Sequence, residues 1–133
     1  MDQQQAQKYQ QLQQQLEGVQ QSIQQMEERI SNVEDAVEGV EGLEDAEEGD
    51  EILASIGAGA FAIAEIKETE EVVTNIGGEA YERKELDEAS ELLNNHIEEL
   101  RSTKDTLEED AEEMYSQIQQ IQMQLQQGMQ GEH

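Results

Sequence analysis

Apolar residues recur at steps that alternate three and four over the first third of the chain. The positions between them are mostly Gln, Glu, Ser and Asn, so the apolar stripe is narrow. This spacing is typical of the a/d seam of a coiled coil, because positions a and d lie on one side of the helix. The pattern predicts a long helix over about residues 5–46, with the seam positions Tyr9, Leu12, Leu16, Val19, Ile23, Met26, Ile30, Val33, Val37 and Val40.

The C-terminal part of the chain repeats the same spacing. Two of its seam positions hold residues other than large apolar ones, Lys104 and Ala111. A Lys in a seam commonly lowers the stability of a coiled coil while it fixes the register of the helices. A second helix is therefore predicted over about residues 85–127, followed by a flexible tail at 128–133. Its seam consists of Leu93, Ile97, Leu100, Lys104, Leu107, Ala111, Met114, Ile118, Ile121 and Leu125. Two helices of matching length are expected to pair antiparallel.

The centre of the chain, residues 50–84, has a different pattern. Short runs rich in Ile, Val, Ala and Phe flank glycine pairs, which predicts two successive β-hairpins. The turn glycines are Gly57, Gly59, Gly77 and Gly78. The predicted fold class is α+β, mainly α: a long antiparallel two-helix coiled coil, within one domain spanning residues 1–133, with two short β-hairpins at the bend.

Four short strands with few aromatic residues enclose almost no core, and open strand edges pair readily with other strands. We therefore expect the hairpins of several subunits to join into a shared sheet or barrel. The residues expected to make these contacts are Ile52, Leu53, Ile56, Phe61, Ile63, Val72, Val73, Ile76 and Tyr81.

Charge narrows the choice of partners. The formal net charge is −26, which disfavours nucleic acid and anionic lipid. The excess of acidic residues suggests adaptation to high salt, where screening weakens self-repulsion. The N-terminal residues do not resemble a signal peptide, and no apolar run is long enough for a membrane helix, so we expect a cytoplasmic protein.

The sequence offers little for catalysis. It has no cysteine, and His96 and His133 have no evident partners. The acidic run at 44–50 lacks the ligand spacing of a calcium loop, and Gly57-Ala58-Gly59 lacks the following Gly and Lys of a nucleotide-binding loop. We expect no enzyme activity, no cofactor and no metal site.

The central residues resemble those of the archaeal prefoldin α subunit. The similar stretches are Leu53–Ala62, Ile66–Val72 and Asn75–Gly78, flanked by two heptad arms. In that family the α class carries two central hairpins and the β class one. The second turn usually reads Gly, small residue, Gly in that family, whereas this chain has Gly77-Gly78-Glu79. The proline usual in the first strand is also absent, with Ala54 and Ser55 in its place in the sequence.

The resemblance implies an ATP-independent chaperone, a hexamer of two α and four β subunits whose hairpins form a β-barrel platform. Its arms would hold non-native proteins and pass them to a group II chaperonin. We predict that clients bind at the arm tips, through Tyr9, Leu12, Leu16, Met114, Ile118, Ile121 and Leu125.

Less specific interpretations remain open. A stripe at heptad spacing is core by default, and a tip residue can pair in the resting arm and meet a client when the tip opens. The Gln-rich segments 3–15 and 117–130 are most simply a solvated helix face. The whole chain could instead be a coiled-coil scaffold for one defined partner, or an acidic decoy for basic nucleic-acid-binding proteins.

Overall fold

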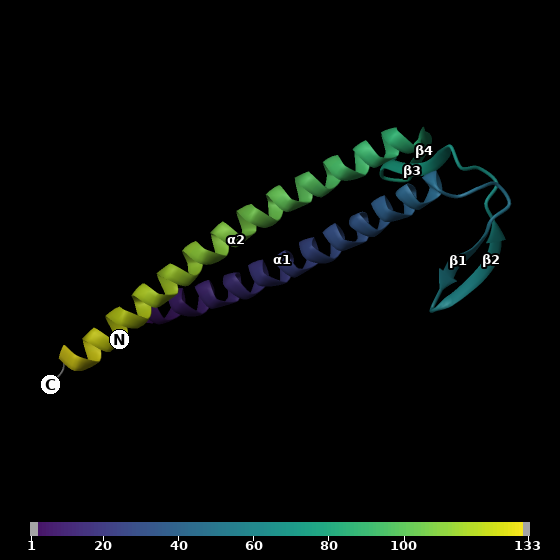
Figure 1. Cartoon of the computed structure of the whole chain (residues 1–133). Coiled ribbons are helices and arrows are strands. Elements are labelled where there is room, and N and C mark those ends of the chain that lie inside the picture. Colours follow the sequence, from purple (N-terminus) through teal and green to yellow (C-terminus); the bar gives the residue numbers. More distant parts are fainter. Residues whose placement is uncertain (1–2, 132–133) are drawn as a thin grey trace. The chain divides into compact units, whose positions relative to one another are not determined.

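Along the sequence, two small β-sheets lie between two long helices. The computed structural model describes residues 3–131. The elements are α1 (Gln3–Glu44), β1 (Glu51–Gly57), β2 (Ala60–Glu65), β3 (Glu71–Gly77), β4 (Ala80–Glu85) and α2 (Leu86–Gly131) (Figure 1). The predicted fold class is confirmed for the single chain, with each hairpin forming its own two-stranded antiparallel sheet. Neither described helix contains a stretch apolar enough to cross a membrane.

The chain divides into two compact units. The first, here called the helical unit, contains residues up to Ile30 and from Glu99 onward. The second, the hairpin unit, is Ser31–Glu98. The helices differ from their expected bounds, because α1 ends at Glu44 and α2 continues past residue 127 to Gly131. Residues 132 and 133 of the expected tail lie outside the described part of the chain.

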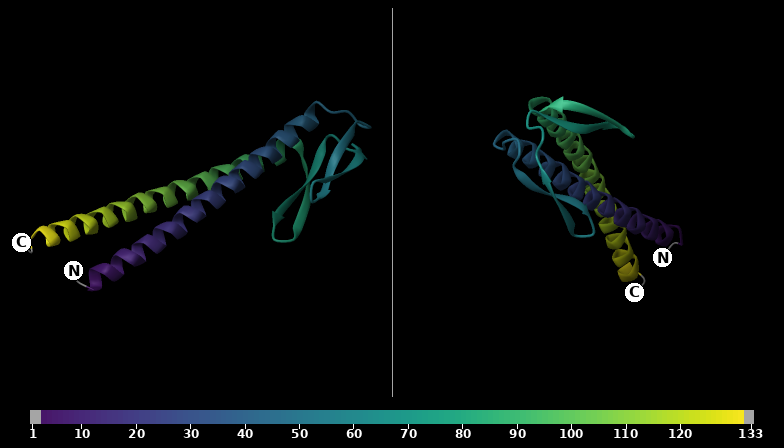
Figure 2. Two further views of the ribbon diagram at one scale, coloured as in Figure 1. Left: turned by 90° about the horizontal axis from the view of Figure 1, so that it is seen from below. Right: turned by 90° about the vertical axis from the view of Figure 1, so that its right-hand side faces the viewer.

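In the helical unit α1 and α2 run antiparallel. Cross-helix contacts pair Gln5 with Gln124 and Glu27 with Lys104, so residue numbers rise along one helix as they fall along the other. The beginning of α1 and the end of α2 therefore lie at the same end of this unit (Figures 1 and 2). Every position of both predicted seams, along the full length of the helices, is buried or half-buried. The heptad spacing thus identified the packed faces correctly.

In the hairpin unit α1 is followed by a tight turn. Gly49 has φ +92° and its N–H donates to the Ile66 carbonyl at 2.8 Å. The Asp50 carbonyl accepts from the Ile66 N–H at 2.9 Å, while the Asp50 carboxylate accepts from the Glu47 N–H at 2.9 Å. These bonds fix the entry into β1. At the other end β4 runs directly into α2, where Asp87 and Glu88 face the positive end of the helix dipole.

The two hairpins share one register. In each, a residue is bulged out beside the turn, Ile56 in the first and Ile76 in the second. Two-residue loops follow, Ala58-Gly59 and Gly78-Glu79. The hairpins form two separate sheets, which the right-hand view of Figure 2 shows as separate ribbons. Because each sheet has only two strands, every strand has one edge that is unpaired within the described chain. These edges keep backbone groups available for hydrogen bonds with another strand.

Candidate functional sites

The seven predicted tip residues form one cluster in the helical unit. Leu12, Ile118 and Ile121 are its buried centre, at 6–8% exposure. The remaining four, Tyr9, Leu16, Met114 and Leu125, are partly buried and pack against it. Heptad spacing on two antiparallel helices brings these residues together. In this conformation all seven belong to the coiled-coil core, so direct client contact requires the seam to open.

Side-chain hydrogen bonds between polar residues join the helices beside this cluster. Gln122 Nε2 donates to the Tyr9 hydroxyl at 2.9 Å, and Gln5 Nε2 donates to Gln124 Oε1 at 3.3 Å. All four groups are reached by water, which competes for the same bonds. Each bond therefore contributes at most about 1 kcal/mol to closing the tip. The seam here is held mainly by a small apolar cluster.

Two large apolar side chains lie near the cluster but outside the seam. Tyr115 is 56% exposed and Met123 is 61% exposed. They are eight residues apart on α2, so they lie about 80° apart around the helix, with Gln119 between them, and the three positions form a stripe on its outer surface. Tyr115 also lines a shallow groove of about 400 Å³ with Leu16, Gln20, Ala111, Glu112 and Ser116. This stripe is accessible while the seam is closed.

Sequence reasoning did not assign Tyr115 to the tip site. The heptad pattern selects seam positions, whereas Tyr115 lies one position beyond Met114 and faces outward. The signal that could have found it is an aromatic side chain on a face otherwise occupied by Glu and Gln. Met123, by contrast, is recognisable from the sequence as an adaptable, unbranched side chain near the tip that lies off the seam.

The hairpins expose the apolar residues that were predicted to make assembly contacts. Ile63 is 75% exposed and Leu53, its cross-strand partner, is 68% exposed. Val72 alone is half-buried. The others are exposed by between 44% and 70%: Ile52, Ile56, Phe61, Val73, Ile76 and Tyr81. Contiguous apolar surface of this kind usually marks an interaction site.

The exposed faces of the two hairpins differ in charge. On the first hairpin, the register places Leu53, Phe61 and Ile63 on one face, with acidic residues only at its base. On the second, Arg83 shares a face with Val73 and lies 3.8 Å from Glu71 and 3.9 Å from Glu68. The first hairpin therefore offers a mainly apolar surface and the second a mixed one.

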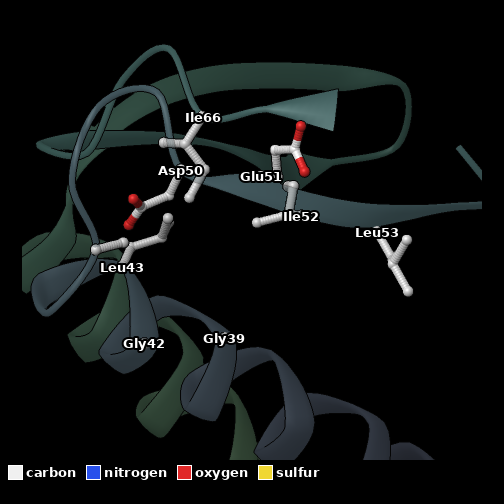
Figure 3. Close-up of a pocket in the computed structure, with 9 residues that line it drawn as sticks. Gly39, Gly42, Leu43, Asp50, Glu51, Ile52, Leu53 and Ile66 are labelled. Atoms are coloured by element: carbon white, nitrogen blue, oxygen red, sulfur yellow. The ribbon is translucent and has the colours of Figure 1, made fainter. Parts of the chain in front are cut away.

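A pocket of about 660 Å³ lies between the end of α1 and the first hairpin. Figure 3 shows Leu43, Ile52 and Ile66 around it, with Gly39 and Gly42 leaving the helix surface bare. Asp50 also lines the pocket, but its carboxylate already accepts the Glu47 N–H. The pocket is open and its lining is mixed, with Asp50 and Glu51 beside the apolar side chains.

The described residues show no group of three or more side chains placed to hold a metal ion. No polar or charged side chain within residues 3–127 is buried, and His96 is exposed. Strongly desolvated carboxylates are what an unusual acid or base would need.

Comparison with known proteins supports the same fold. The sequence profile of a family described as "Prefoldin subunit" matches residues 12–131. The cryo-EM structure of a filamentous PFD from Methanocaldococcus jannaschii superposes with a TM-score of 0.78 at 21% identity. The match covers 86% of this chain and 95% of that one. A search of curated proteins found no match.

Proposed function

This chain belongs to the prefoldin family, and from that premise we propose that it is a subunit of an ATP-independent holding chaperone. The subunit assembles through its hairpins and holds non-native proteins at the tip of the helical unit. The observation that carries the proposal is the exposed pair Tyr115 and Met123 beside a weakly closed seam cluster. Unbranched Met and amphipathic Tyr adapt to many partner surfaces, as a holding site requires.

Assembly follows from the exposed hairpin faces. Covering Leu53, Phe61 and Ile63 removes large apolar surface from water, at about 25 cal/mol for each Å². We propose that the partners are prefoldin β subunits, with this chain as the α subunit of a hexamer of two α and four β chains. The two hairpins of this chain support the α class. The proposal includes the β-barrel platform, a cytoplasmic location and transfer of clients to a group II chaperonin.

The mass of the assembly in solution tests the partner. The chain alone and the chain mixed with a cognate β subunit should be compared at high salt. A discrete hexamer only in the mixture supports the α assignment. An open-ended series of masses for the chain alone would contradict it and favour self-assembly, since the matched archaeal structure is of a filamentous protein.

The holding site is tested by changing the exposed stripe. The variant Y115S/M123S should assemble normally yet suppress aggregation of a chemically unfolded protein less well, as measured by light scattering. The matched control is L92S, which changes the third exposed apolar side chain of α2, 37% exposed, in the hairpin unit. Equal activity of wild type and Y115S/M123S would argue against this stripe.

Deletion of residues 1–16 and 115–133 is the stronger test. Assembly should persist because the hairpin unit is intact, while protection of clients is lost. Full protection by the truncated chain would exclude the tip as the holding site. Saturable binding of one sequence, with no protection of unrelated unfolded proteins, would instead favour a scaffold.

A further inference from the structure

Within the described parts of α1 and α2, the acidic residues stop at the same level on both helices; Asp2 and Glu132 of the sequence lie outside the described residues. On α1 the last acidic residue before the N-terminal segment is Glu17, and residues 3–16 carry Lys8 as their single charge. On α2 the acidic residues end at Glu113, and residues 114–131 carry no charge. Leu16 and Met114, which adjoin these boundaries, pack against the same cluster. We call residues 3–16 and 114–131 the neutral tip.

The neutral tip is an exception within a chain of net charge −26. Its exposed positions are mainly glutamines, whose amides both donate and accept hydrogen bonds without carrying charge. The exposed apolar side chains Tyr115 and Met123 lie among them. The tip therefore combines apolar contacts, neutral hydrogen-bonding groups and almost no field of its own.

The length of this segment is sufficient to separate a ligand from the acidic part of the helices. Residues 114–131 extend about 25 Å at 1.5 Å per residue. The screening length is about 10 Å at 0.1 M salt and about 3 Å at 1 M. A polypeptide bound over the outer turns of the tip is thus screened from Glu17, Glu113 and the acidic residues beyond them.

The negative charge of the helices outside the neutral tip indicates which class of ligand benefits from an uncharged tip. A basic polypeptide would be attracted by acidic residues there, so removing them would serve no purpose in its capture. An acidic polypeptide would be repelled by the acidic part of the helices but not by the neutral tip. We propose that the neutral tip is a binding surface for acidic, non-native polypeptides. This inference rests on the proposed holding function and specifies its client class.

The test uses three labelled unfolded peptides of equal length and identical apolar residues. Their remaining variable positions are all Glu, all Gln or all Lys. Binding to the full-length assembled chain is measured by fluorescence anisotropy over a range of salt in which the far-UV circular dichroism is constant. Wild type should bind the Glu and Gln peptides with similar affinity. The Lys peptide should also bind the acidic helices, and salt should abolish that part.

Two triple variants place the same added charge inside and outside the neutral tip. Q10E/Q13E/Q14E acidifies the tip, and Q21E/Q24E/Q25E repeats the spacing eleven residues further along α1, where Glu17, Glu27 and Glu28 already lie. All six glutamines are exposed. The tip variant Q10E/Q13E/Q14E should bind the Glu peptide about fivefold more weakly than wild type at low salt, because several like charges then lie close to the bound peptide. The effect should fade with salt.

Specificity for the tip decides the outcome. Unchanged binding of the Gln peptide to both variants, and of the Glu peptide to the control variant, supports the inference. Wild type that binds the Gln peptide but rejects the Glu peptide overturns it while the holding function stands. Equal loss in both triple variants also overturns it. Failure of the assembled wild type to bind any of the three peptides overturns the holding function itself, and this inference with it.

Discussion

Lys104 is the one charged residue in the predicted seam of α2. It is half-buried, and its Nζ lies 3.4 Å from Glu27 of α1 and 3.6 Å from Glu108 of its own helix. Both glutamates are about half exposed, so water weakens these ion pairs and each contributes little to stability. The cross-helix contact nevertheless defines which residues of α1 and α2 lie opposite each other. Lys104 therefore helps to fix the register between α1 and α2, and it makes the seam less stable than an apolar residue would.

Replacing this lysine with leucine should stabilise the helical unit. K104L places an additional apolar side chain in the seam, where its burial contributes about 1 kcal/mol more than the ion pairs it removes. The urea midpoint of the far-UV circular dichroism should rise. The control E27Q keeps the lysine and removes its cross-helix partner, and it should lower the midpoint only slightly. A lower midpoint for K104L would mean that the ion pairs outweigh apolar burial.

Individual residues were predictable where their role follows from periodicity. Tyr9 and Ile121 lie 112 positions apart, yet their heptad phase placed both in the cluster that the structure contains. Tyr115 was not assigned because its exposure has no periodic signal. The contact between Lys104 and Glu27 could not be predicted either, because the heptad pattern gives the packed face of each helix but not where the ends of long side chains lie.

The two hairpins have the same register but different turns. In the loop Ala58-Gly59 both residues have positive φ, at 51° and 78°, as in a type I′ turn. In the loop Gly78-Glu79 only Gly78 has positive φ, at 57°, which fits a type II′ turn. Glu79 stands where the prefoldin α pattern that the sequence resembles has glycine. The structure accommodates it because the second residue of this turn needs no left-handed backbone.

Equivalent alanine substitutions should therefore have unequal effects. G59A forces a Cβ onto a residue at φ 78° and should destabilise the first hairpin by about 1–2 kcal/mol. E79A, at the same position of the second loop, should have little effect. Amide hydrogen exchange in the assembled protein measures both: first-hairpin amides should exchange about tenfold faster in G59A. Equal changes in the two variants would contradict this assignment of the turns.

At the level of elements, the sequence predicted the helices, hairpins and seams, and it left the exact ends open. The heptad pattern predicted that α1 ends near residue 46, but its end at Glu44 depends on the turn closed by Asp50 and Gly49. The C-terminal end of α2 was placed too early because the last seam residue is Leu125. Glutamines are good helix formers, and the helix continues through them to Gly131.

Across the whole molecule, charge and apolar surface are distributed unevenly. The helices carry most of the acidic residues, the first hairpin presents a mainly apolar face, and residues 114–131 carry no charge at all. Like charges oppose folding because they are closer together in the folded chain than in the unfolded one. These uncharged surfaces are the ones proposed for assembly and for client binding, where a partner must approach closely.

Salt should consequently stabilise this protein well beyond its effect on a chain of balanced charge. Screening at 2 M salt reduces repulsion among exposed carboxylates that persists at 0.1 M. If this repulsion costs about 3 kcal/mol, the midpoint of thermal unfolding should rise by about 10 °C between these concentrations. Sodium chloride and tetramethylammonium chloride should act alike, since screening depends on ionic strength. Sucrose at equal osmolality serves as the uncharged control. An equal rise of the midpoint in sucrose would show that the effect comes from solvent exclusion. A midpoint that does not change with either salt would show that the net charge of −26 is tolerated without screening.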